Sequence, residues 1–148
     1  MTRHVRGPRG GTAGQTLAEF ALIVPVLLLL FMGILDFGRA IYGYNTLANA
    51  AREGARVAIV DQTVTAGVAV AAQRAADQST GLGVDPATDV DVEYTQPDGT
   101  ACPNRSLGCI ATVTVRYQFT AITPIIGTIV GPIDIEAETA MDVEFTKP

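Results

Sequence analysis

The sequence predicts an α+β protein: a long N-terminal transmembrane helix that continues into a small extracytoplasmic domain with a second helix and a roughly three-stranded antiparallel sheet. Three observations predict this class. An uncharged apolar run lies near the N-terminus, a helical periodicity follows it, and three later segments alternate apolar and polar residues. We therefore expect a basic leader over residues 1–14, a long helix over 15–59 and an extracytoplasmic α+β domain over 60–148.

The apolar run is long enough to cross a membrane. The run over residues 17–35 is nineteen residues long, close to the roughly 20 that a spanning helix needs. Twelve of residues 20–35 are Leu, Ile, Val or Phe. Together they supply roughly −4 to −7 kcal/mol of insertion free energy. Glu19 lies near the end of the run, where a charge costs less than the roughly 3 kcal/mol expected at the bilayer centre, so the segment is predicted to insert.

The flanking charges predict the orientation. Residues 1–14 contain three arginines and no acid, whereas Asp36 and Arg39 cancel on the other side. The positive-inside rule then places the N-terminus in the cytoplasm and residue 40 onward outside the cytoplasmic (inner) membrane, as a single-pass protein. The alternative is a secretory signal cleaved after Ala50, but that site lies some fifteen residues beyond the apolar core.

The helix is predicted to continue beyond the membrane. Small residues recur at helical spacing: Ala48, Ala51, Ala55 and Ala58. If residues 16–58 are helical, they make a rod of about 64 Å, roughly half of it outside the bilayer. Pro25 removes one helical hydrogen bond and is expected to kink the rod inside the membrane. The small-residue face can cover the protein's own outer domain or pack against another subunit.

The remaining residues predict the outer domain. Residues 61–81 have the periodicity of a helix, and residues 88–95, 109–122 and 133–145 alternate as half-buried strands. Residues 124–131 form an apolar connection broken by Gly and Pro. This connection can contact a partner subunit or the bilayer surface, or it can be a buried crossover between strands.

Cys102 and Cys109 are close in sequence within a turn-rich stretch, which fits a disulfide in an oxidising compartment. Closing this short loop would contribute about 2.5 kcal/mol. Two free thiols in a cytosolic loop are the alternative. No metal site is expected, because two cysteines supply too few ligands and the only histidine, His4, is distant. Acids on the third strand are interpreted as its solvent-facing side.

Composition argues against several classes of function. Residues 60–148 carry twelve acids against four basic residues, so nucleic acid is not an expected partner. His4 lies in the leader, and the only serines, Ser79 and Ser106, are predicted to lie across the membrane from it. No catalytic Ser/His/Asp arrangement can then form within the chain. We expect no enzymatic activity, no cofactor and no small-molecule substrate.

The stretch GQTLAEF at residues 14–20 resembles the cleavage region of prepilin-type signal sequences. In that pattern a basic leader ends at a small residue, and a hydrophobic helix with Glu at its fifth position follows. The cut would fall between Gly14 and Gln15, which makes Glu19 the fifth residue of the mature chain and Phe20 its neighbour. A plain membrane anchor has no need of this glutamate.

Over about residues 14–59 the chain resembles the TadE-like proteins, minor pilins or pseudopilins of the tight-adherence (Flp, type IV-like) pilus system. The residues that carry the resemblance are Glu19, Phe20, Pro25 and the block Ala51, Arg52, Glu53, Gly54, Ala55 and Arg56. The resemblance implies processing by a prepilin peptidase. It implies as partners other pilins or pseudopilins, the pilus assembly platform and ATPase, and the lipid bilayer.

For Glu19 the resemblance implies a role in subunit register. Cleavage would give Gln15 a new α-ammonium at the membrane edge, and a carboxylate buried among helices needs a cation. The amine of a neighbouring subunit would supply it. The alternative is that Glu19 only snorkels to the interface. The alternative function is a single-pass anchored extracytoplasmic binding module that never enters a filament.

Overall fold

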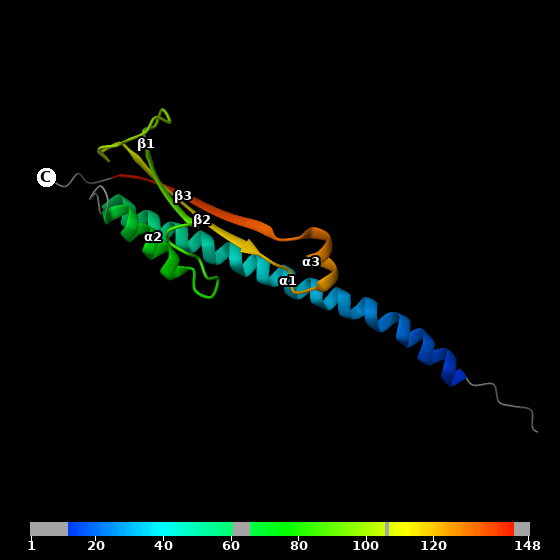
Figure 1. Cartoon of the computed structure of the whole chain (residues 1–148). Helices are drawn as coiled ribbons and strands as arrows, with labels where there is room; N and C mark the ends of the chain where they lie inside the picture. Colours follow the sequence, from blue (N-terminus) through cyan, green and yellow to red (C-terminus); the bar gives the residue numbers. More distant parts are fainter. Residues whose placement is uncertain (1–11, 61–65, 106, 144–148) are drawn as a thin grey trace, which may run out of the picture.

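The computed structural model describes residues 12–60, 66–105 and 107–143 (Figure 1). Its elements are α1 (Thr12–Val60), α2 (Ala66–Gln78), β1 (Val90–Thr95), β2 (Ile110–Phe119), α3 (Pro124–Val130) and β3 (Ile133–Asp142). One long helix, a second helix and a three-stranded antiparallel sheet make an α+β fold, so the predicted fold class is confirmed.

Helix α1 dominates the shape of the molecule. Its 49 residues extend about 74 Å at 1.5 Å per residue. The helix begins at Thr12, so Gly14, the last residue of the predicted leader, lies inside it. It also continues across Pro25. Figure 1 shows that the N-terminal half of α1 projects away from all other elements, whereas its C-terminal half lies along the sheet.

The sheet has the order β1-β2-β3, with β2 pairing antiparallel to both neighbours. The register aligns Val90 of β1 with Val115 of β2, and Val115 with Ala137 of β3. All three side chains are buried, which confirms the inward faces predicted from the alternation. Acidic residues of β3 occupy the positions on either side of Ala137 and are exposed.

The core is made largely of small residues. Helices α1 and α2 pack together on one face of the sheet, where Ala51, Ala55 and Ala58 of α1 are fully buried. Ala48, predicted for the same face, is only half-buried. The hydroxyl of Tyr94 donates a 2.9 Å hydrogen bond to the carbonyl of Ala58, which ties β1 to the end of α1. The long helix therefore completes the core of the outer domain.

A disulfide closes the loop between β1 and β2. Cys102 and Cys109 are bonded and both are buried, so the predicted pairing is confirmed. Arg105 lies within this loop with a positive φ of 46°, and its guanidinium sits over the Tyr94 ring, 4.4 Å from the centroid. The loop is thereby held against β1.

The connection between β2 and β3 differs from the interpretation as a buried crossover. Residues 124–130 form the short helix α3, and none of its residues is buried. Pro124 opens the helix and Gly131 ends it with a φ of 72°. Proline suits a first helical turn because its missing N–H needs no partner there. The buried-crossover interpretation is therefore wrong, and contact with a partner subunit or the bilayer stays a prediction.

Candidate functional site

The N-terminal half of α1 exposes its apolar surface. None of residues 14–35 is buried, and Leu17 and Leu22 are 73% and 76% exposed. Within the described residues this helix is long and apolar enough to cross a membrane. A surface of contiguous Leu, Ile, Val and Phe is unfavourable in water but suits acyl chains. This half of α1 is the candidate membrane span.

The predicted cleavage residues lie at the start of this surface. Gly14, Gln15, Glu19 and Phe20 are all exposed on α1. The side-chain amide of Gln15 donates a 3.2 Å hydrogen bond to the Glu19 carboxylate, one helical turn away. A Cβ built on Gly14 meets no other group within 4 Å. Both the predicted cut and the glutamate are thus accessible from outside the chain.

The predicted family block divides between two sides of α1. Ala51, Gly54 and Ala55 face the core, whereas Arg52 and Arg56 face outward. A Cβ built on Gly54 would lie 3.0 Å from the Cβ of Ala75 in α2 and 3.1 Å from Cγ1 of Val113 in β2. Glycine at this position therefore lets α1, α2 and the sheet approach one another closely.

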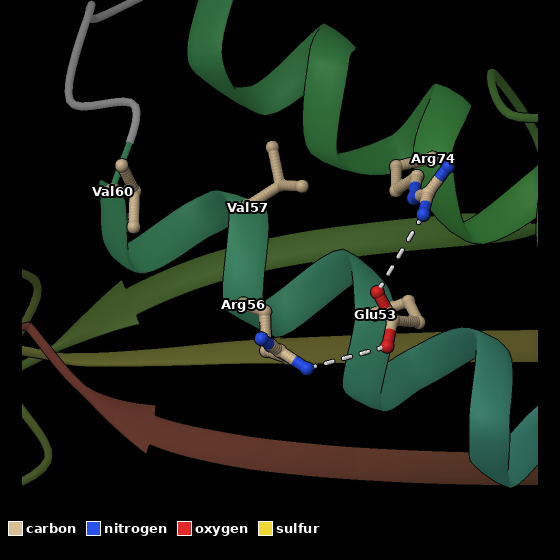
Figure 2. A pocket seen from close by; sticks show the side chains of 5 residues that line it. All are labelled: Glu53, Arg56, Val57, Val60 and Arg74. Carbon is tan, nitrogen blue, oxygen red and sulfur yellow. Dashed lines mark ion pairs between the residues drawn. The ribbon is translucent and has the colours of Figure 1, made fainter.

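Glu53 belongs to the outward side of the same block and joins both helices (Figure 2). Its carboxylate pairs with Arg56 at 3.6 Å within α1 and with Arg74 of α2 at 3.7 Å. These residues line a shallow surface pocket together with Val57 and Val60. All the charged partners are partly solvated, so the pairs orient the two helices more than they stabilise them.

The junction between the two halves of α1 is centred on Asp36, the first residue after the predicted span. Asp36 is buried and accepts hydrogen bonds from the backbone N–H groups of Ile122 and Thr123, each at 2.9 Å. The Thr123 hydroxyl donates a third, at 2.6 Å. Since these donors favour the ionised form, led by the Thr123 hydroxyl, they lower the pKa of Asp36 to about 2 against the opposing effect of burial.

Arg39 completes this junction. Its guanidinium pairs with Asp36 at 3.3 Å, three residues earlier in α1, and lies over the Phe119 ring, 5.3 Å from the centroid. The long-range partners of Asp36 were not predicted, because no local pattern connects residues 86 and 87 positions apart. The clue in the sequence is an acid at the end of an apolar run, which needs a partner if it is to lie at a membrane edge.

Fold and site together define a class: an α+β protein with one exposed N-terminal apolar helix whose outer half is built into the domain. The family model described as TadE-like protein matches residues 14–56, so this segment is TadE-like and the resemblance is confirmed over it. The family is a pilus-associated structural family. The match ends inside α1 and does not include α2 or the sheet. The chain has no match among curated proteins or solved structures.

Proposed function

We propose that this protein is a minor pilin or pseudopilin of a tight-adherence (Flp, type IV-like) pilus, packed through α1 during assembly. The observation that carries the proposal is the TadE-like segment itself. It begins at Gly14, where the predicted cut falls, and it includes the apolar residues 14–35, none of which is buried. Such a surface needs acyl chains before assembly and other helices after it.

The same proposal divides the chain by function. Residues 1–14 form a cytoplasmic leader, residues 17–35 cross the inner membrane, and residues 60–148 lie outside the cytoplasm. A prepilin peptidase removes the leader, and the pilus assembly platform and ATPase act on the processed chain. The protein is then located in the membrane or in a pilus at the cell surface.

Cleavage after Gly14 would create a partner for the carboxylate of Glu19. Gln15 would acquire an α-ammonium, and its present side chain already lies within hydrogen-bonding distance of the Glu19 carboxylate. In a bundle of such helices the carboxylate loses its hydration and requires a cation. We propose that the α-ammonium of a neighbouring subunit supplies it and so sets the axial register between subunits.

The mature N-terminus tests processing directly. The full chain is co-expressed with its prepilin peptidase, purified from membranes and analysed by mass spectrometry. We expect a chain that begins at Gln15. A chain that retains residues 1–14 would favour the alternative, an anchored extracytoplasmic binding module outside any filament. A chain that begins at Ala51 would show that the apolar segment is an export signal.

Two variants test the role of Glu19 separately from processing. Glu19→Gln keeps the shape of the side chain and removes its charge, and Glu19→Ala removes both. We expect both variants to insert into the membrane but to be lost from assembled pili, because neither can pair with an amine. The control is Arg52→Ala, an outward-facing change in the same helix. Normal co-assembly of Glu19→Gln would rule out the pairing.

A further inference from the structure

Helix α3 presents an apolar surface that no described part of the chain covers. Ile125, Ile129 and Val130 are 54%, 79% and 56% exposed. From Thr120 to Pro132 the sequence contains no charged residue. A short helix with several solvated aliphatic side chains is unfavourable in water, and such patches mark contacts with a membrane or a protein.

The position of α3 indicates which contact this is. Figure 1 shows α3 as the part of the outer domain nearest the projecting half of α1. The Cδ1 atom of Ile126 lies 3.8 Å from the Cβ position of Gly33, inside the predicted span. Asp36 holds Ile122 and Thr123, the residues just before α3, at the end of that span. Helix α3 therefore lies level with the last turn of the membrane segment.

Several backbone groups at the ends of α3 have partners within the protein. Asp36 accepts the two backbone N–H groups that precede the helix, and Pro124 has none. The N–H of Gly127 donates to the carbonyl of Thr123 at 2.8 Å, and that of Gly131 donates to Gly127 at 3.1 Å. Backbone groups that enter an apolar phase need such internal partners. These internal partners lower the cost of placing the segment in apolar surroundings.

We propose that α3 inserts into the bilayer leaflet on the side of the outer domain, as a second lipid contact beside the membrane span. Its apolar surface is continuous with that of α1, where Leu30 and Ile34 are 57% and 60% exposed. Tyr42 and Tyr44 of α1 are exposed just beyond this level, where tyrosines mark the membrane–water interface. The occupant of the α3 surface is therefore phospholipid acyl chains.

Two attachments to the same leaflet fix the outer domain on the membrane surface. Span and α3 together restrain rotation and tilt of the domain, and the Asp36 contacts join them rigidly. The inference rests on the membrane span in the proposed function, and the experiment below includes a reporter for that span alone.

The chain contains no tryptophan, so one introduced Trp reports a single position. Three variants of the full chain are reconstituted into phosphatidylcholine vesicles with or without brominated acyl chains: Ile129→Trp in α3, Leu27→Trp in the span and Val70→Trp in α2. Val70 is the matched control, because it is an exposed aliphatic residue beside Ala71, which contacts Gly54. Gly54 lies about 28 Å along α1 beyond Leu35, the end of the predicted span, so Val70 is well outside the bilayer.

We expect the fluorescence of Ile129→Trp to be blue-shifted. Brominated lipid should quench most of that fluorescence, as it should for Leu27→Trp, and acrylamide in the aqueous phase should quench little of it. Val70→Trp should show the opposite pattern. If Ile129→Trp is quenched by acrylamide and not by brominated lipid, α3 is in water and the proposal is wrong. Protection from both quenchers would indicate contact with a second copy or another protein and would also overturn it. Loss of lipid quenching at Leu27→Trp would instead refute the span.

Discussion

The two halves of α1 are one continuous helix in two different surroundings. None of residues 14–35 is buried, although this is the most apolar part of the chain. In residues 36–60 the buried positions are Asp36, Gly43, Leu47, Ala50, Ala51, Gly54, Ala55 and Ala58. Large aliphatic side chains thus cover the half that is the candidate membrane span, and small residues cover the half that meets α2 and the sheet. Hydropathy alone does not locate the core of this protein; residue size at helical spacing does.

The largest effect should separate two leucines of the same helix. Leu47 is fully buried and Leu28 is 58% exposed. Leu47→Ala should lower the unfolding free energy of the outer domain by about 2–5 kcal/mol, because it leaves a cavity. Leu28→Ala should leave that value unchanged. The measurement is urea unfolding of the full chain in detergent micelles, followed by the near-UV circular dichroism of its tyrosines. Equal losses in both variants would mean that the two halves of α1 unfold as one unit.

The sequence predicted the features that depend on short-range patterns and missed those that depend on long-range contacts. Alternation in β1, β2 and β3 is a short-range pattern, and it predicted the half-buried strands in which Val90 and Val115 are buried. Helix α3 was missed because it has seven residues and no polar face. Pro124 is nevertheless typical of the first position of a helix, and Gly131 is typical of the position just after its end. The partners of Asp36 depend on how β2 returns to α1, which a single sequence does not display.

The next comparison concerns two glycines of the outer half of α1. A Cβ at Gly54 would lie 3.0 Å from Ala75, whereas one at Gly38 would meet nothing within 4 Å. Gly54→Ala should destabilise the outer domain by about 1–3 kcal/mol through overpacking. Gly38→Ala should stabilise it by up to about 1 kcal/mol, because alanine favours the helix. Thermal unfolding of both variants under identical conditions measures the difference, and a stabilised Gly54→Ala would show that α2 can move away.

The boundary between the halves should respond to acid. Because the pKa of Asp36 in the folded protein is lowered to about 2, its contribution to stability is complete above its ordinary pKa near 3.8 and is lost as the pH falls toward 2. NMR spectra of the Ile122 and Thr123 amides should therefore show one shared titration near pH 2. Asp36→Asn should abolish this titration at both amides. A midpoint at the ordinary value would mean that the three hydrogen bonds do not favour the carboxylate.

The smallest effect should come from the charges that join α1 to α2. Arg74→Ala removes the cross-helix pair with Glu53, which is partly solvated on both sides. We expect a loss of about 0.2–1 kcal/mol that disappears at high salt, because exposed ion pairs are weak and screened. Arg52→Ala is the control, since the Arg52 guanidinium donates to the neutral amide oxygen of Asn49 and forms no ion pair with the residues that the structure describes. If Arg74→Ala cost as much as Leu47→Ala, ion pairing rather than close packing of small residues would hold α2 on α1. The contrast between the two halves of α1 would then be one of charge rather than of side-chain size.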